Sequence, residues 1–279
     1  MTPDHSAAEE TIIRPPSGWL SFNLGEAWTH REMLLYLVQR EISGIYRQSI
    51  LGLAWALISP IVLLGVFSVV FGNFIGVSAG GDVPYPVFVF AGLLPWQFFQ
   101  AACSEATRSL VTHRHLLQKV YIPRIYLPLT SVGLRLVDLV MGLFVLLGVM
   151  VIYGVVPPWQ IAFLPLLLIH TVVLTTSVGL LFAGLNARFR DIGFGLPFAL
   201  QMLMYLSPVI YPSRAVPENL AILYSINPIA GLIDGFRSCI IGSEWNVMSY
   251  AMSLGMTFIL AFVGLVVFRR AETYAVDVA

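Results

Sequence analysis

The stretch that decides the fold is residues 139–187, LVMGLFVLLGVMVIYGVVPPWQIAFLPLLLIHTVVLTTSVGLLFAGLNA, which contains no Asp, Glu, Lys or Arg in 49 positions. A helix that crosses a membrane needs about 20 apolar residues to span ~30 Å of hydrocarbon. This stretch is long enough for two such helices, and Pro157-Pro158-Trp159 near its middle supplies the turn between them. Because its apolar residues are continuous rather than alternating, the pattern indicates helices and not barrel strands.

Further runs without charged residues lie on both sides of this stretch, at residues 48–81, 83–104, 192–213 and 245–268. Another span begins near Ile125, although Arg135 and Asp138 interrupt it. We therefore predict an all-α polytopic membrane protein whose six-span domain occupies residues 49–268. The six predicted transmembrane helices are 52–75, 85–107, 126–154, 161–184, 194–212 and 246–268.

Composition excludes several classes of protein. Only 11% of the 279 residues are charged and 58% are hydrophobic, whereas a soluble domain carries about 25% charged residues. The formal net charge is zero, so the chain offers no basic surface to nucleic acid. Two cysteines, Cys103 and Cys239, provide neither a disulfide framework nor a paired-cysteine metal site, and no metal site is predicted.

The distribution of cations predicts the orientation. Twelve of the fifteen Lys and Arg residues lie in segments that share one side of the membrane if both termini are cytoplasmic. The positive-inside rule favours this arrangement. We expect a multi-pass protein in the inner (plasma) membrane. Residues 1–28 and 269–279 are then cytoplasmic tails. Residues 1–28 lack the basic and apolar regions of a cleavable signal peptide.

Residues 29–48 are predicted to form an amphipathic interface helix. Thr29 and Glu32 have the spacing of a capping box, and Leu34, Val38, Ile42 and Ile45 form an apolar stripe opposite several arginines. Such a helix lies at the lipid–water interface or docks on a partner.

The outer segment 213–245 is predicted to form short re-entrant helices between spans five and six. Asn227 is a good N-cap, Pro228 suits the first helical position, and Gly242 suits the C-terminal end. The resulting helix would be about 21 Å long, too short to cross the bilayer. A plain amphipathic cap on the outer surface is the alternative.

Charged residues within spans are costly and are functional candidates by default. Arg135 and Asp138 are spaced i, i+3 and are predicted to form an intramembrane ion pair on one helix face. The same spacing recurs in Glu105 and Arg108, and again in Asp234 and Arg237. No chain of acids or histidines suggests a proton relay, and no glycine-rich loop suits nucleotide binding.

Aromatic residues near the spans are candidates for a channel lining. Phe67, Phe71 and Phe74 have the spacing of one helical stripe, and Tyr205 and Tyr211 are further candidates. If they face a pore, they offer flat surfaces to sugar rings. Interfacial belts and packing are the alternative explanation.

Several motifs together resemble a known family: Arg47–Trp55 with Ser59-Pro60, Arg188–Ile192, Leu200-Gln201, Ser207–Pro212, Asn227-Pro228 with Phe236-Arg237, and Phe268–Arg270. They resemble the membrane subunits of type-2 ABC exporters, and most closely the permeases for O-antigen, capsular polysaccharide and teichoic acid. The combination covers most of residues 29–272 and is specific.

The resemblance implies a transport subunit that is not itself an enzyme and has no cofactor of its own. Two copies would form a homodimer around a channel, and two separate ATP-binding subunits, carrying Mg-ATP, would drive it. The cargo would be a lipid-linked polysaccharide that moves from the cytoplasmic to the outer face. The alternatives are an exporter of teichoic acid, a drug or another small molecule, and an intramembrane enzyme acting on lipid-linked sugars.

The resemblance also assigns roles to residues. The outer hairpin would close the channel mouth with Asn227, Pro228, Asp234 and Arg237. The 29–48 helix, the 108–124 connector and the 186–191 turn would contact the ATPase. The ATPase-coupling residues are then Arg40, Arg47, Arg114, Lys119, Arg124, Arg188, Arg190 and Asp191.

Overall fold

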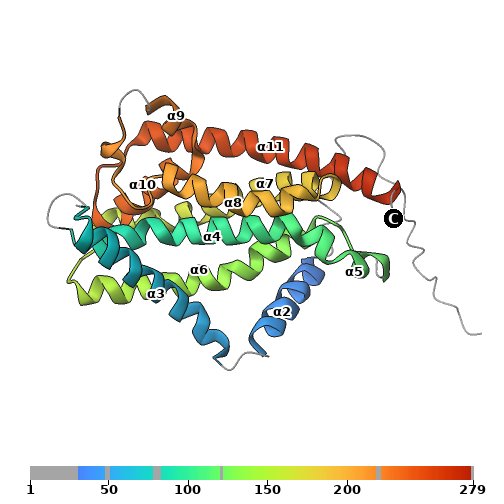
Figure 1. Ribbon diagram of the computed structural model, residues 1–279, viewed down its shortest axis with the longest axis horizontal. Helices are drawn as coiled ribbons and strands as arrows, with labels where there is room; N and C mark the ends of the chain where they lie inside the picture. Colours follow the sequence, from blue (N-terminus) through green and yellow to red (C-terminus); the bar gives the residue numbers. More distant parts are fainter. Residues whose placement is uncertain (1–30, 48–50, 78–82, 120–121, 218–220, 278–279) are drawn as a thin grey trace, which may run out of the picture.

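The computed structural model describes residues 31–47, 51–77, 83–119, 122–217 and 221–277, and within these ranges the chain is helical and has no strand. Figure 1 shows the helices as a bundle of long, roughly side-by-side rods with α2 and α3 splayed from one side. The α-helices are α2 (Arg31–Arg47), α3 (Trp55–Phe67), α4 (Tyr85–Thr112), α5 (Arg114–Lys119), α6 (Tyr126–Ile152), α7 (Leu164–Arg188), α8 (Asp191–Leu206), α9 (Ala221–Ile226), α10 (Pro228–Ile241) and α11 (Val247–Asp277). The shorter elements are the 3₁₀ helices η1 (Gly52–Ala54), η3 (Trp159–Phe163) and η4 (Ser213–Ala215) and the π-helix η2 (Ser68–Phe74).

Five helical stretches in the described part of the chain are long and apolar enough to cross a membrane, and they match five of the predicted spans. They are Trp55–Phe74, Tyr85–Thr112, Tyr126–Ile152, Trp159–Arg188 and Val247–Ala271. Beyond the last of these, α11 remains helical to Asp277, so most of the segment expected as a tail continues the helix.

The fifth predicted span, 194–212, corresponds to α8, which begins at Asp191 and already ends at Leu206. Its 16 residues rise about 24 Å, less than the hydrocarbon thickness. The prediction placed the end of this helix at 212 and was wrong there: Pro208 and Pro212 follow closely, and residues 207–212 are not helical. A sixth crossing therefore stays a prediction.

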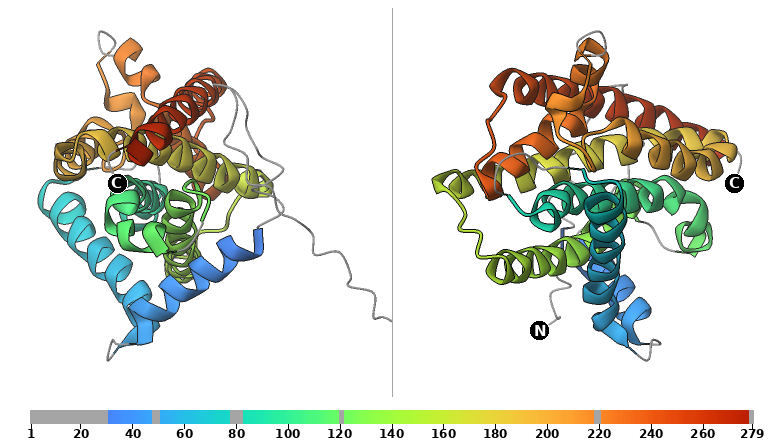
Figure 2. Two further views of the ribbon diagram at one scale, coloured as in Figure 1. Left: turned by 90° about the vertical axis from the view of Figure 1, so that its right-hand side faces the viewer. Right: turned by 60° about the vertical axis from the view of Figure 1, so that its left-hand side comes forward.

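Helix α4 is the centre of the bundle. In its most apolar 18-residue window 78% of the residues are buried, compared with 17% for the α3–η2 span and 22% each for α6 and α11. It packs against α3, α6, α7, α8 and α10, and its position between α6 and α8 is visible in Figure 1 and from two other sides in Figure 2. Because α4 is enclosed by protein, the outer helices present the apolar faces that suit lipid.

Helices α7 and α11 approach closely because glycines stand at their contact. A Cβ atom on Gly264 would lie 2.5 Å from the Ser177 carbonyl oxygen, and one on Gly184 would lie 2.9 Å from Cα of Phe268. Small residues at such positions allow two membrane helices to pack backbone to backbone.

Helix α2 confirms the predicted N-terminal helix between residues 31 and 47, and it packs on α6 of the same chain. Among the side chains of α2 described between residues 31 and 44, the one buried apolar side chain is Leu37, which lies with Ile122 and Tyr126 in a small core cluster. The neighbouring Val38 packs so closely that a Cβ on Gly133 would lie 2.9 Å from it. Thr29 of the predicted capping box lies outside the described residues.

The face of α2 that packs on α6 is centred on Leu37, beside the apolar stripe predicted from the sequence. Leu37, which was not assigned to that stripe, is 4% exposed, whereas Leu34, Val38 and Ile42 are only half-buried. The side chain of Ile45 lies outside the described part. Since α2 covers the start of α6 and touches Ile122, it is joined to the connector between α5 and α6.

We expect Gly264→Ala to destabilise the protein by about 1–3 kcal/mol, because its methyl group would collide with a backbone carbonyl. The matched control is Gly255→Ala on the same helix, where a Cβ meets nothing within 4 Å. The control gains helix propensity and should be neutral or slightly stabilising. Thermal unfolding of the detergent-solubilised protein measures both; equal melting temperatures for the two variants would contradict this account of the α7–α11 contact.

Candidate transport site

The uncovered side of α4 is polar. From Val87 to Ser109 only six of its side chains are not buried, and Ala101 is the one apolar member of that set. The other five are Gln97, Gln100, Ser104, Glu105 and Arg108.

Four of these residues lie at i, i+3, i+7 and i+11, which places them on one face of the helix. We call Gln97, Gln100, Ser104 and Arg108 the α4 polar strip. The sequence analysis missed it, although this spacing of polar residues in an otherwise apolar span was a visible signal.

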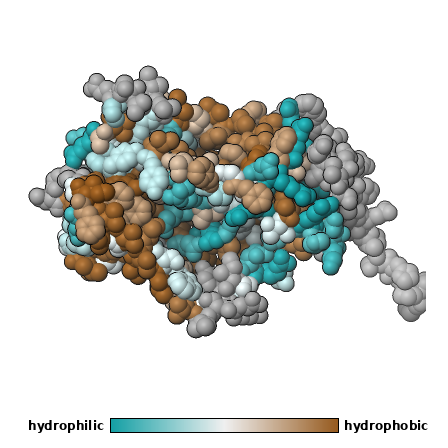
Figure 3. Space-filling model, viewed as in Figure 1, coloured by the Kyte–Doolittle hydropathy of each residue, from teal (hydrophilic) through white to brown (hydrophobic). Residues whose placement is uncertain are grey.

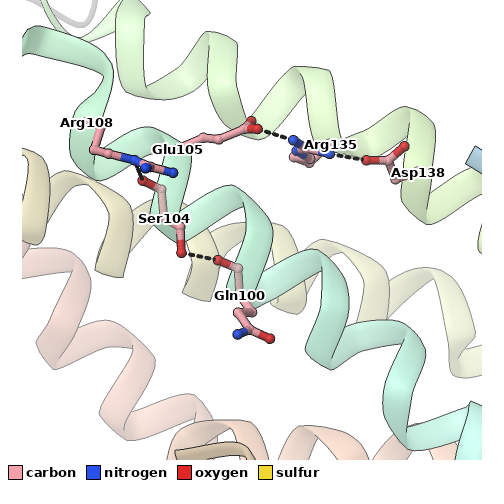
Figure 4. Close-up of polar contacts among 6 residues, drawn as sticks. All are labelled: Gln100, Ser104, Glu105, Arg108, Arg135 and Asp138. Carbon is pink, nitrogen blue, oxygen red and sulfur yellow. Dashed lines mark hydrogen bonds and ion pairs between the residues drawn. The ribbon is translucent and has the colours of Figure 1, made fainter. Parts of the chain in front are cut away.

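Hydrogen bonds connect the strip along α4 and across to α8. The indole nitrogen of Trp96 donates to Gln100 Oε1 at 3.0 Å, and Gln100 Nε2 donates to Gln201 Oε1 of α8 at 3.2 Å. The Ser104 hydroxyl donates to the Gln100 carbonyl at 2.7 Å, and Arg108 Nε donates to the Ser104 carbonyl at 3.3 Å (Figure 4). Figure 3 shows polar surface running through the middle of the face on which α4 lies, between apolar surfaces.

An ion cluster beside the strip joins α4 and α6 near the end of the bundle that holds α5 and the α7–α8 turn. We call this end inner and the opposite end outer, after the orientation predicted from the positive-inside rule. Arg135 donates to Asp138 Oδ2 at 2.7 Å, which confirms the predicted pair, and also to Glu105 across the helix interface (Figure 4). The i, i+3 spacing of Glu105 and Arg108 suggested that these two residues pair, but Glu105 instead pairs with Arg135 of α6. A cation between two carboxylates reduces the cost of holding charge in a span.

Asn186, near the end of α7, ties α4, α7 and α8 together at the inner end. Its side-chain nitrogen donates to the Thr107 carbonyl at 2.9 Å, and its oxygen accepts from the Gly193 amide at 2.7 Å. The second bond is shorter than the 3.2 Å bond from the same amide to the Arg190 carbonyl, and it strengthens the first turn of α8, where amides lack the usual helical acceptor. Asn186 is 2% exposed, so both bonds are shielded from water.

Arg237 of α10 has the corresponding role at the outer end. Its guanidinium donates to the carbonyls of Val209 at 2.8 Å, Tyr211 at 3.2 Å and Phe88 at 3.4 Å, and it lies 3.7 Å from the ring centre of Phe88. The Tyr85 hydroxyl donates to the intervening carbonyl, that of Ile210, at 3.0 Å. Three consecutive carbonyls of the non-helical segment after α8 are thus satisfied by two side chains.

Asn227 and the ends of α10 add further contacts to the segment after α8. Asn227 caps α10 by accepting from the Ile229 amide at 3.3 Å, as predicted, and it donates to the Ser207 hydroxyl at 2.8 Å. Pro228 occupies the first position of α10, and Gly242 ends it with φ 69°. A short helix, α9, lies just before α10.

Asp234 does not form the expected ion pair with Arg237; it accepts a hydrogen bond from the Ser213 hydroxyl.

Most of the predicted coupling residues gather at the inner end of the bundle, where α5, the α7–α8 turn and the last turns of α11 lie (Figure 1). Arg124 is half-buried there, and Arg40 pairs with Glu41 on α2 at 3.2 Å. The side chain of Arg47 lies outside the described residues. The exposed members at this end are Arg114, Lys119, Arg188, Arg190 and Asp191.

The aromatic residues predicted to line a channel do not share one surface: some pack on the core and others are exposed. Phe67 and Phe71 stack with ring centres 5.4 Å apart and pack on the core, whereas Phe74 is 80% exposed. The predicted stripe assumed an α-helix, but residues 68–74 form a π-helix, whose wider turn changes the angular position of Phe74. Tyr205 is exposed, and the Tyr211 hydroxyl donates to its carbonyl at 3.2 Å.

Comparison with known proteins assigns the family. Residues 32–241 match the family described as ABC-2 type transporter. The chain belongs to this family. It is a multi-pass membrane transport permease.

Its relatives include exporter permeases that it matches over most of their length. The O-antigen export system permease protein RfbA of Klebsiella pneumoniae is 24% identical over 257 residues, covering 91% of this chain and 96% of the relative. The RfbA protein of Myxococcus xanthus is 28% identical, covering 76% and 82%. The polysialic acid transport protein KpsM of Escherichia coli is 24% identical, covering 85% and 92%.

We expect Arg237→Lys to lower stability by about 2 kcal/mol, because one ammonium group cannot reach all three carbonyls and leaves some without a donor. Arg214→Lys is the control, since Arg214 is exposed on the neighbouring η4. Thermal unfolding and limited proteolysis within residues 207–212 report the effect. Unchanged unfolding and cleavage in Arg237→Lys would show that this segment is held by other contacts.

Proposed function

We propose that the permease moves a lipid-linked polysaccharide, similar to an O-antigen, from the cytoplasmic to the outer face of the inner membrane. The observation that carries this proposal is the match over 91% of the chain to a permease named for O-antigen export. A second relative is named for polysialic acid transport, which supports a polysaccharide cargo. The polar strip on α4 adds a surface that suits a hydrated cargo.

The driving force comes from separate subunits in this proposal. Two copies of the chain form a homodimer, and two ATP-binding subunits hydrolyse Mg-ATP on its cytoplasmic side. The chain has no P-loop motif of its own. The exposed charges on α5 and on the α7–α8 turn form the docking surface, next to a cavity of about 200 Å³ lined by residues that include Arg188 and Arg270.

The contacts at the inner end provide a route for the motion. A push on the α5–α6 connector reaches α2 through Ile122 and Leu37, and reaches α4 through the Arg135–Glu105 bond. A push on the α7–α8 turn reaches α4 through Asn186 and Thr107. Two of these paths, through Glu105 and through Thr107, end on α4, so movement of the ATPase subunits changes the position of the central helix.

At the opposite end, α9 and α10 form the outer gate and dip into the membrane from outside. The 14 residues of α10 span about 21 Å, and ten of them besides Arg237 are buried, which suits a helix enclosed by protein at membrane depth. Both chain termini are cytoplasmic, in agreement with the positive-inside distribution.

The proposed function is tested in cells that lack this chain. We expect lipid-linked glycan to accumulate on the cytoplasmic side, because synthesis continues while export stops, and expression of the chain together with its ATPase subunit should restore surface polymer. The measurement is glycan extracted from inside-facing and outside-facing leaflets. Normal surface polymer with no internal glycan would favour a small-molecule cargo and contradict the proposal.

The coupling surface is tested by the double variant Arg188→Ala/Asp191→Ala. We expect export to fall at least tenfold while ATP hydrolysis by the assembled complex continues, because force no longer reaches α8. The control is Arg214→Ala/Glu244→Ala, which removes the same two charges from exposed positions in the segments before and after α10. If Arg188→Ala/Asp191→Ala exports as much as the control variant, the contact with the ATPase subunit lies elsewhere.

A further inference from the structure

The α4 polar strip stands out against the other uncovered surfaces of the spans. The exposed positions of the outer helices carry large apolar side chains, for example Val62 on α3, Phe144 on α6 and Phe258 on α11, which are 58%, 61% and 72% exposed. Such faces suit lipid chains. Three polar side chains and an arginine in a row on one membrane helix would be costly against lipid, so this face has a different neighbour.

The strip has unused hydrogen-bonding capacity. Gln97 Nε2 is buried and has no hydrogen-bond partner in the described part of the chain. Gln100 uses one of its two side-chain N–H groups for Gln201. Carboxamides and hydroxyls both donate and accept, as sugar hydroxyls do, and the one carboxylate beside the strip, Glu105, is paired with Arg135.

The strip exposes the inner part of α4, whereas the outer part of this helix is buried. From Gln97 to Arg108 it rises about 16 Å, roughly half of the hydrocarbon thickness. By contrast, every α4 side chain from Val87 to Trp96 is buried. There α10 and the segment after α8 cover the helix so closely that a Cβ on Gly92 would lie 2.9 Å from Arg237 and 3.0 Å from the Val209 carbonyl.

We propose that the α4 polar strip, together with Gln201, is the inner half of the export path and contacts a hydroxyl-rich sugar chain directly. This inference rests on the proposed export function and adds the surface that meets the cargo. Each amide–hydroxyl hydrogen bond contributes only about 1 kcal/mol. As the sugar chain moves, successive hydroxyl groups bind the same amides in turn, so binding is too weak to stop the movement. In the described conformation the exposed part of this side of α4 ends at Gln97, because the residues from Val87 to Trp96 are buried.

Cysteine labelling tests whether the strip faces water. The background is the Cys103→Ala/Cys239→Ala variant, because both native thiols are buried and free. Single cysteines then replace Gln97, Gln100 or Ser104 in the assembled complex with its ATPase subunits. The controls are Phe258→Cys and Ile259→Cys, on the exposed apolar face of α11.

We expect a charged, membrane-impermeant methanethiosulfonate, applied from the cytoplasmic side, to label the strip at least tenfold faster than the α11 controls. Labelling at the rate of the controls would overturn the inference. Rapid disulfide formation between two copies through Ser104→Cys, with no labelling, would also overturn it, because the strip would then be a contact between subunits.

An export measurement tests the contact with sugar. We expect Gln100→Leu/Gln201→Leu to reduce polymer export at least fivefold, with normal assembly and ATP hydrolysis. The matched variant Gln100→Asn/Gln201→Asn keeps the amides and should retain most export. Equal export by the two double variants would contradict a contact with the cargo.

The two proposals fail differently. In one outcome the strip is labelled, but cells that lack the chain accumulate no internal glycan. This outcome supports the path along α4 and contradicts the polysaccharide cargo. In the other outcome cells that lack the chain accumulate glycan, but the strip is not labelled in the purified complex. This outcome supports the polysaccharide cargo and contradicts the path along α4.

Discussion

The outer half of the bundle depends on one requirement, that backbone carbonyls remote from water find a donor within the protein. Helix α8 ends at Leu206, and the six residues after it form no helix, so their carbonyls have no helical partners. Arg237 satisfies two of them and a third on α4, and Tyr85 satisfies the carbonyl between. The arginine is therefore an integral part of the fold at this end, and Gly92 is required because its missing side chain leaves room for the guanidinium.

The same requirement is met at the inner end by Asn186, which supplies an acceptor to the first turn of α8 and a donor to α4. Helix α8 is thus a short rod fixed at both ends by buried polar side chains that come from other helices. Hydrogen bonds of this kind are directional, and losing one leaves a buried polar group without a partner. Displacing α8 along its axis would break bonds at both ends, so α8 moves most readily together with α4 and α7.

The features that could be predicted from sequence are those set by local chemistry. Charge-free runs located five spans, and residues 227, 228 and 242 correctly marked the two ends of α10. The features that could not be predicted depend on pairing between distant segments. No local pattern shows that Glu105 meets Arg135 and not Arg108, or that Arg237 reaches three carbonyls in place of Asp234. The enclosure of α4 was also hidden, since a buried span and a lipid-facing span are equally apolar in composition.

The enclosure of α4 has a consequence for the proposed mechanism. Its polar side is exposed only between Gln97 and Arg108, and the α4 residues from Val87 to Trp96 are buried. A polymer that follows this helix to the outer face must therefore separate α4 from one of the elements that cover it there, and Arg237 holds α10 and the segment after α8 to it. Hydrogen bonds to a charged group contribute about 1.5–3 kcal/mol each, so three of them form a substantial barrier at the outer end. The barrier falls if water or sugar hydroxyls replace the donors as the segment moves, since both can satisfy the released carbonyls. In the proposed mechanism the outer end therefore opens where water or a hydroxyl-bearing cargo can reach these carbonyls.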